Sequence, residues 1–404
     1  MRNRNNREKS SISTSGEGPD SGSGDGPYDS ANVSRSTLLR AAAGAVAAGG
    51  LLVGAGAATA RATGATGANG APNGRRRGRR AQALEVKKIA DLTGPGLTTR
   101  FRMEATDLGI PARTPDGRTL WVFGDTFENA TVGGGWWRSP VALWSTTTDL
   151  NAGVTWSGAV GGDAAQQLWP YEHDNPEFST VLPSDVITIG GTMYLHAMVN
   201  NGLHNVVWSE IWRSDDSGAT WVHTGAKFPG DRDGRLFQCL TWGLGNDGWV
   251  YVYSTSFDRK GPIILNRVRS EAIADPAAYE PWGYRDGAWN WGNPPTPILE
   301  GAFGELCLRP LGGKWVLTWF NAGDYRIDGI IMDTPTSDLY AAPRQTLIWG
   351  GDWGNEDDSH VAQLYGGYII PGSTLGELHL SVSQWNTEVN WPYRVMQHRI
   401  RGFG

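Results

Sequence analysis

Two aspartates, Asp107 and Asp125, stand in segments whose spacing could bring their carboxylates together. Between them lies Pro-Asp-Gly-Arg at residues 115–118, which has strong turn-forming chemistry because proline fixes φ and glycine permits positive φ. The apolar runs at 108–113 and 119–123 are of strand length. If the chain folds back at this turn, position 107 lies opposite about position 126. The sequence therefore predicts neighbouring carboxylates at one end of a β-hairpin, an arrangement suited to acid/base chemistry on a sugar.

The elements that must position this pair are strands. From residue 84 onward, short apolar runs alternate with turns rich in Gly, Asn, Asp and Pro, which is typical of an all-β protein. Five apolar hairpins recur with turns 50–80 residues apart. They span residues 108–123, 186–198, 240–253, 306–320 and 361–382. Five repeats at this period predict a five-bladed β-propeller that occupies residues 84–404 as one domain.

A second motif also favours a propeller. Residues 214–221 fit the pattern Ser-x-Asp-x-Gly-x-Thr-Trp, which resembles the Asp-box turn of sialidase-type propellers. In such a turn the aspartate accepts backbone N–H groups, glycine permits the required backbone angles and tryptophan packs between sheets. We therefore expect Asp216 to be structural rather than catalytic.

Further polar residues fall at comparable ends of the five hairpins, where the inner strands of a propeller converge. Asp185 and Glu305 precede or begin inner strands, and His196 and Asn321 lie on returning strands. We expect these four residues to contribute to substrate binding around the Asp107–Asp125 pair. For Asp185 and His196 a second interpretation is open, namely that the two side chains pair with each other as a structural bond.

Aromatic residues could supply the binding surface. Trp136 and Trp137 are adjacent in a Gly-rich loop, where stacking on sugar rings is a better explanation than core packing. His173 lies on a Pro-flanked loop that could reach the same pocket. A further cluster, Trp282, Trp289 and Trp291, suggests a similar stacking role.

The first 83 residues have a different composition. Residues 1–60 combine a long charged segment with an Ala/Gly-rich apolar run at 41–60 that ends in a small-residue cleavage site, which predicts an export signal and a secreted protein. Residues 34–40 resemble a twin-arginine signal, with Ser36 in place of the second arginine. A transmembrane anchor is the alternative interpretation of the run. Residues 61–83 form a basic linker that could contact an anionic cell wall.

The net charge of the folded part limits the kinds of partner that it can bind. Residues 1–80 hold 12 of the 35 basic and 5 of the 41 acidic residues, which leaves 23 basic and 36 acidic residues, a formal charge of −13, in the remainder. An acidic globular part argues against nucleic acid as a partner and suits a neutral or cationic ligand better, and we expect a polysaccharide substrate. We expect a monomer.

Two cysteines occur, Cys239 and Cys307, and they could either form a disulfide in an exported protein or be two buried small residues. Their number and spacing match no zinc motif. We expect neither a metal nor another cofactor.

At this point the motifs resemble a known family. The pairing of Thr-Asp-Leu-Gly at 106–109 with Phe-Gly-Asp-Thr-Phe at 123–127 is similar to the domain of unknown function 4185, as are Asp-Leu-Thr-Gly at 91–94 and Tyr-Ile-Ile-Pro-Gly-Ser at 368–373. Members of that group are classed in glycoside hydrolase family 183, the endo-D-arabinanases. The resemblance implies a five-bladed propeller, hydrolysis of internal α-D-arabinofuranosyl linkages in arabinogalactan or lipoarabinomannan, and Asp107 and Asp125 as the catalytic pair.

Several alternatives remain open at this level. Either aspartate could be the acid, and its partner could be a base for water or a nucleophile, since these options differ only in carboxyl separation. A non-catalytic carbohydrate-binding propeller would need the aromatic loops but not the paired acids. A sialidase-like hydrolase would need three arginines around a carboxylate, and no such set stands out at equivalent positions of the hairpins.

Overall fold

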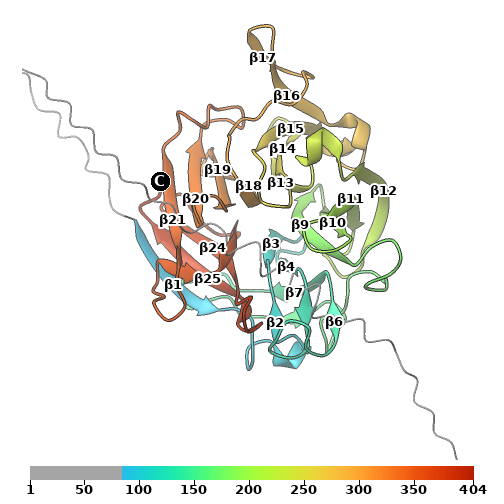
Figure 1. The fold of residues 1–404 in the computed structure, drawn as a ribbon, viewed down its shortest axis with the longest axis vertical. Coiled ribbons are helices and arrows are strands. Elements are labelled where there is room, and N and C mark those ends of the chain that lie inside the picture. The colour runs from blue at the N-terminus through green and yellow to red at the C-terminus, as the bar shows by residue number, and fades with distance from the viewer. Residues whose placement is uncertain (1–83) are drawn as a thin grey trace, which may run out of the picture.

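The computed structural model describes residues 84–404, and this part of the chain is built almost entirely of β-strands (Figure 1). Its helical elements are five single 3₁₀ turns. These are Thr99–Phe101, Leu150–Ala152, Arg232–Arg235, Ser270–Ala272 and Pro276–Ala278. None of the helices in residues 84–404 is long and apolar enough to cross a membrane. The all-β prediction is confirmed, and the predicted export signal (1–60) and basic linker (61–83) lie outside the described residues.

The strands form six sheets. The first four-stranded sheet runs β3 (Ile110–Arg113), β4 (Thr119–Phe123), β7 (Val141–Ser145), β8 (Gly158–Ala159). A small sheet beside it runs β2 (Ala105–Thr106), β5 (Thr126–Phe127), β6 (Trp137–Arg138). The next runs β9 (Thr180–Ile189), β10 (Thr192–Asn200), β11 (Val206–Ser214), β12 (Val222–Pro229).

Two five-stranded sheets and one four-stranded sheet complete the fold. One runs β13 (Cys239–Leu244), β14 (Trp249–Thr255), β15 (Ile264–Arg269), β16 (Glu280–Arg285), β17 (Ala288–Trp291). The next runs β18 (Phe303–Leu311), β19 (Lys314–Asn321), β20 (Arg326–Met332), β21 (Arg344–Gly351), β22 (His360–Ala362). The last runs β23 (Leu364–Ile369), β24 (Glu377–Trp385), β25 (Tyr393–Arg401), β1 (Glu85–Asp91).

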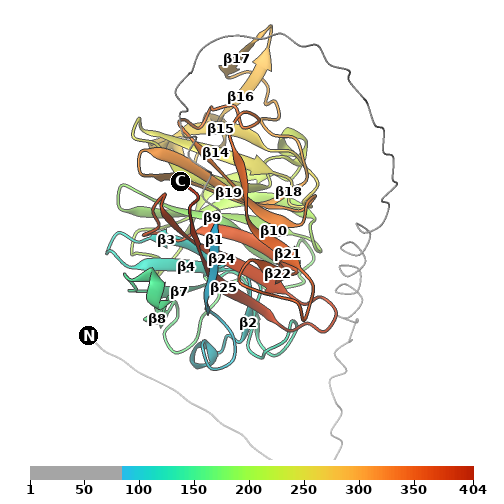
Figure 2. The same ribbon diagram turned by 90° about the vertical axis from the view of Figure 1, so that its left-hand side faces the viewer.

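The five larger sheets are arranged around a common centre (Figures 1 and 2). Their first strands β3, β9, β13, β18 and β23 contact one another in this order, and β23 also contacts β3. These inner strands are almost wholly buried and rich in Val, Ile and Leu, as expected of strands covered on both faces. The ends at which the inner strands begin therefore lie near one another, and this is where the site is found.

All five predicted hairpins are present as antiparallel pairs: β3–β4, β9–β10, β13–β14, β18–β19 and β23–β24. The glycines of their turns adopt positive φ, as at Gly117 and Gly191. The turn chemistry visible in the sequence thus set the location of each hairpin.

The Asp box forms the predicted turn between β11 and β12. Asp216 Oδ1 accepts hydrogen bonds from the Ser214 hydroxyl (2.8 Å) and the Thr220 backbone N–H (2.9 Å), and the Trp221 indole donates to the Gly218 carbonyl (3.1 Å). These bonds stay within the turn, so Asp216 is structural.

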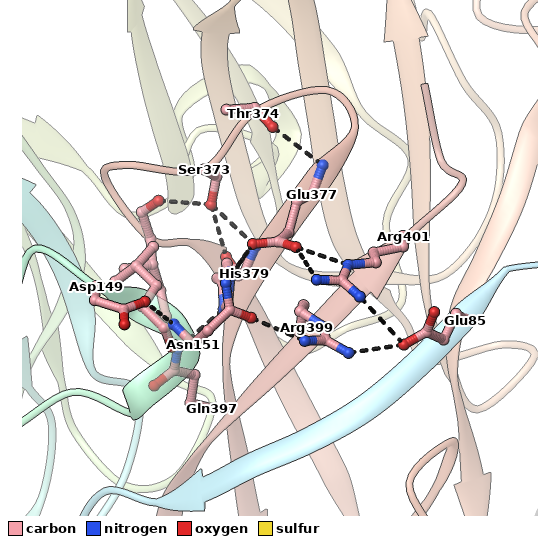
Figure 3. Close-up of polar contacts among 12 residues, drawn as sticks. Glu85, Asp149, Asn151, Ser373, Thr374, Glu377, His379, Gln397, Arg399 and Arg401 are labelled. Carbon is pink, nitrogen blue, oxygen red and sulfur yellow. Dashed lines mark hydrogen bonds and ion pairs between the residues drawn. The ribbon is translucent and has the colours of Figure 1, made fainter.

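The two ends of the described chain meet in the last sheet, where β1 pairs antiparallel with β25. A polar network reinforces this junction (Figure 3). Glu377 accepts from Arg401 (2.7 Å) and Asn151 (2.7 Å), and Arg399 donates to Glu85 (2.7 Å). The network joins β1, β24 and β25 to the loop between β7 and β8, so the first and last strands stabilise each other.

Asp185 is a structural tie rather than the predicted substrate ligand. Its side chain is completely buried and forms a bidentate ion pair with Arg309 of β18 (2.6 and 3.0 Å), and it accepts from Thr241 and from the Trp242 backbone of β13. These charge-assisted bonds join three inner strands and occupy both carboxylate oxygens, so neither oxygen is left for a ligand. Asp185 is therefore structural. The pairing with His196 that the sequence suggested is not formed, since Arg309 takes its place.

Cys239 and Cys307 are both buried and free, and the Ile369 backbone N–H donates to Cys307 Sγ (3.2 Å). Of the two interpretations that the sequence left open, the structure shows the pair as buried small residues.

Asp185→Ala should destabilise the fold strongly, because it leaves the Arg309 guanidinium buried without its partner. Breaking one side of such a pair costs about 3–5 kcal/mol, measured by urea unfolding. Asp215→Ala, at an exposed aspartate that pairs with Arg213 on the surface, is the matched control and should change stability by less than about 1 kcal/mol. Equal unfolding midpoints for the two variants would contradict the structural assignment.

Candidate active site

The β2–β5 pair places Asp107 opposite Asp125. Thr106 and Thr126 are partners in this antiparallel pair, and their hydroxyls are 2.7 Å apart. Asp107 follows Thr106 and Asp125 precedes Thr126, so the same register carried one step further sets the two aspartates across from each other. The Gly124 backbone N–H donates to the Asp107 carbonyl (3.3 Å), which holds the two segments together. The sequence placed position 107 opposite about position 126, and the structure places it opposite position 125, one residue away.

A bend in the backbone separates β2 from β3 and fixes the direction of Asp107. Leu108 and Gly109 both have positive φ (64° and 66°), which is uncommon for leucine. Two serines of β24 hold this bend: Ser383 Oγ accepts from the Leu108 N–H (2.8 Å), and Ser381 donates to the Leu108 carbonyl (3.2 Å). The last sheet thus anchors a residue of the first.

Asp107 is held in a form that binds a proton near neutral pH. Burial, then the charge of Asp125, raises its pKa to about 7, although hydrogen bonds from Tyr393 and Tyr365 act in the opposite direction. The Tyr365 hydroxyl donates to Oδ2 (2.9 Å), while Oδ1 is buried beside Gly124 with no hydrogen-bond partner in residues 84–404. An unpaired buried oxygen disfavours the ionised carboxylate.

Asp125 has a more polar environment. Burial raises its pKa to about 6, and hydrogen bonds from Trp137 and Thr180 oppose the increase. The Trp137 indole (2.8 Å) and the Thr180 hydroxyl (3.1 Å) both donate to Oδ1. Because both donors stabilise the charged form, Asp125 ionises before Asp107, and its other oxygen is left without a protein donor among the described residues.

A third acid, Glu305, stands on the same rim. It is almost fully buried in β18, forms a 2.5 Å ion pair with Arg259, and adds to the charge that raises the pKa of Asp107. The Arg259 guanidinium lies 4.9 Å from the centre of the Tyr365 ring, and its Nε has no partner within the described chain. A line of contacts therefore runs from Glu305 through Arg259 and Tyr365 to Asp107.

The loop residues form a platform beside Asp125. Trp137 stacks on His173 with ring centres 3.8 Å apart, and burial lowers the pKa of His173 to about 4, so the imidazole is neutral at pH 7. Trp136 is placed differently: it lies between the guanidinium groups of Arg102 (5.1 Å) and Arg138 (4.1 Å). Trp137 and His173 thus lie beside the aspartate pair, whereas Trp136 packs against two arginines.

Two other predicted ligands are structural. His196 is fully buried against Trp242, neither ring nitrogen has a partner in the described residues, and burial lowers its pKa to about 3. Asn321 donates to Asp328 (2.9 Å) and Asp324 (3.1 Å), which orders the turn after β19. Like Asp185, both occupy sites with no access for a sugar, so the prediction of substrate contact by these three residues is corrected.

Four functional residues escaped the sequence analysis: Thr180, Arg259, Tyr365 and Tyr393. Thr180 and Tyr365 stand at the start of the inner strands β9 and β23, so the same rule that selected Asp107 and Glu305 could have selected them. Tyr393 begins an outer strand, and Arg259 is on a loop with φ 59°, so no periodic signal marks either residue.

The site thus combines a carboxyl group that loses its proton near pH 7, a second that loses its proton near pH 6, and a pair of stacked rings beside them. Such a carboxyl pair can donate a proton to a leaving group and activate or supply a nucleophile.

Comparison with known proteins agrees with the family that the motifs indicated. Residues 93–399 match the domain of unknown function DUF4185. The chain belongs to the DUF4185 family. An uncharacterized 35.9 kDa protein in the asd 3′ region of Mycolicibacterium smegmatis is 32% identical over 333 residues, which cover 78% of this chain and 97% of that protein. Notoamide biosynthesis cluster protein J′ of Aspergillus versicolor is 31% identical and covers 71% of this chain and 83% of its own.

Among solved structures, this DUF4185 chain resembles a putative hydrolase from Bacteroides ovatus. The TM-score is 0.56 at 15% sequence identity, with 80% of this chain and 92% of that chain covered. At this identity the likeness concerns the fold.

Asp107→Asn should make this DUF4185 protein more stable at pH 8. A carboxyl group whose folded pKa is raised binds a proton more tightly than the unfolded chain does, so stability falls as pH rises from about 4 to about 7. The amide does not titrate and removes this loss. We expect equal melting temperatures of variant and wild type near pH 4 and a variant that melts a few degrees higher at pH 8. A difference that is the same at both pH values would contradict the raised pKa.

Proposed function

We propose that the protein is a secreted glycoside hydrolase in which Asp107 is the general acid and Asp125 is the general base or nucleophile. The observation that carries the proposal is the asymmetry of the pair: Asp125 accepts two side-chain donors on one oxygen, whereas Asp107 has a buried oxygen without a partner in the described residues, and burial raises the pKa of both. Separated pKa values within one carboxyl pair assign acid and base.

The chemistry follows from these roles. Asp107 donates its proton to the departing glycosidic oxygen as the bond to the anomeric carbon breaks. Asp125, held through Oδ1 by Trp137 and Thr180, uses its other oxygen to deprotonate water or to attack the anomeric carbon. The anomer of the first product distinguishes inversion from retention.

The substrate follows from the family resemblance: internal α-D-arabinofuranosyl linkages of arabinogalactan or lipoarabinomannan. The site offers aromatic and polar groups to a neutral sugar: the half-buried Trp137 and His173 rings lie beside Asp125, and Arg259 carries an N–H without a protein partner in the described residues. Ser256, Asp258 and Lys260, on the loop that carries Arg259, line a cavity of about 380 Å³, and we propose it as a place for further sugar units.

We also propose that the five larger sheets are the blades of one closed propeller with this site at the mouth of its channel. The order of contacts between inner strands and the pairing of β1 with β25 support this architecture. Export rests on residues 1–60, and cell-wall contact on the basic residues of 61–83.

Asp107→Asn and Asp125→Asn should each lower hydrolysis of D-arabinan by at least about 10²-fold, because positioned proton transfer contributes 10²–10⁴-fold. Release of oligosaccharides from purified arabinogalactan is the measurement, with circular dichroism to verify folding. Asp174→Asn is the matched control, since this exposed carboxylate lies near Asp125 without contacting it and should retain activity within a few-fold. Near-normal hydrolysis by both variants would refute the roles, whereas binding without hydrolysis by wild type would favour a carbohydrate-binding protein.

The pH–rate profile should be bell-shaped with its maximum between about pH 6 and 7. Activity rises as Asp125 loses its proton near pH 6 and falls as Asp107 loses its proton near pH 7. In Tyr365→Phe the alkaline limb should move to higher pH, because the lost hydrogen bond had stabilised ionised Asp107. An alkaline limb that moves to lower pH would contradict this role of Tyr365.

A further inference from the structure

The hairpin β16–β17 carries four aromatic side chains on one face, and we call it the aromatic hairpin. Trp282 is the strand partner of Trp291, and Tyr284 is the partner of Trp289. Because side chains alternate between the two faces of a strand, these four rings share a face. They are in contact: ring centres are 4.8 Å apart for Trp282–Trp291, 6.0 Å for Trp282–Trp289 and 5.7 Å for Tyr284–Trp289.

The aromatic hairpin is braced from its other face. A Cβ at Gly283 would lie 1.9 Å from the Pro294 carbonyl oxygen, so the following segment packs directly against the hairpin backbone. The Asn293 side chain donates to the Gly283 carbonyl (3.1 Å), and the Tyr284 N–H donates to Thr296 (2.9 Å). The turn residues Asp286 and Gly287 both have positive φ, as a tight two-residue hairpin requires. The rings are therefore held in place before any ligand arrives.

Part of this face is open to solvent. Trp282 and Trp291 pack against the core of their sheet, whereas Tyr284 is 53% and Trp289 38% exposed. Arg267, paired with Glu280, lies over the ring of Trp291 at 4.3 Å and gives the row a polar border. Rigid rings with polar neighbours suit a ligand that has both apolar faces and hydroxyl groups.

The exposed area of the two rings favours a sugar chain over a protein as the ligand. At their exposed fractions, Tyr284 and Trp289 together offer roughly 200 Å², whereas a stable protein interface takes about 800 Å² from each partner. A row of two or three rings matches instead a few consecutive residues of a linear polysaccharide.

The aromatic hairpin is remote from the aspartate pair. It projects from the outer edge of its sheet, and both views place it at the opposite end of the molecule from β2, which precedes Asp107 (Figures 1 and 2). A chain bound here is therefore not the chain segment being cleaved.

We infer that the aromatic hairpin is a second carbohydrate-binding site, which holds a neutral cell-wall polysaccharide by stacking on Tyr284 and Trp289 and keeps the enzyme on polymeric substrate. The identity of the ligand rests on the proposed function, whereas the presence of a binding site on the aromatic hairpin does not.

The test compares full-length wild type with the double variant Tyr284→Ala/Trp289→Ala in co-sedimentation with insoluble arabinogalactan. The variant should bind about tenfold more weakly, as expected when two stacking contacts are lost, yet hydrolyse short soluble arabino-oligosaccharides at the wild-type rate. Tyr284→Phe/Trp289→Phe should restore binding. Trp349→Ala, which removes a 43% exposed tryptophan from another sheet, is the matched control and should bind as wild type does.

Equal sedimentation of wild type and the double variant, or no sedimentation of wild type, would overturn the inference. So would a wild-type dimer in light scattering that the double variant abolishes, because the rings would then serve self-association. If wild type binds through these rings but hydrolyses no arabinan, the inference stands and the proposed activity fails.

Discussion

Burial of two adjacent carboxyl groups is the constraint on which the rest of the site depends, because it raises the pKa of both. Asp107 and Asp125 face each other across a short strand pair in a partly buried position, where two negative charges destabilise one another. The two carboxyl groups differ in the hydrogen-bond donors that surround them. Asp125 receives two donors on one oxygen, whereas Asp107 keeps an oxygen without a partner in the described chain. The result is one carboxyl group that holds its proton to a higher pH than its neighbour does, which is what acid/base catalysis needs.

Residues from two further sheets supply this asymmetry. Thr180 comes from β9, Tyr365 from β23, Tyr393 from β25, and the serines that hold the bend at Leu108 from β24. Away from the pair, the Asp185–Arg309 bridge ties β9, β13 and β18 together in the interior. Two pairs of buried charged groups thus have different uses. The Asp185–Arg309 pair, in which both carboxylate oxygens have partners, stabilises the fold, whereas the Asp107–Asp125 pair keeps oxygens that have no partner in residues 84–404 and are free for chemistry.

Much of the fold and the central pair could be predicted from the sequence, because both depend on local signals. Turn residues located all five hairpins, and the Pro-Asp-Gly-Arg turn fixed the register that sets Asp107 across from Asp125. The sequence does not tell which of the surrounding polar residues are structural and which belong to the site. Asp185 and Glu305 both lie on inner strands before an apolar run, yet Asp185 bonds to two neighbouring inner strands and Glu305 pairs with a loop arginine at the rim. Which partner a buried carboxylate finds depends on contacts distant in the chain, which no single-sequence pattern records.

Carbon-13 NMR titration of the aspartate carboxyl groups decides whether the pair divides the roles of acid and base, with signals assigned from the Asp107→Asn and Asp125→Asn variants. Asp107 should titrate near pH 7 and Asp125 near pH 6, and the pKa of Asp107 should fall when Asp125 is replaced by the neutral amide. Titration of both groups near pH 4, with no response of either to replacement of the other, would contradict this division of roles.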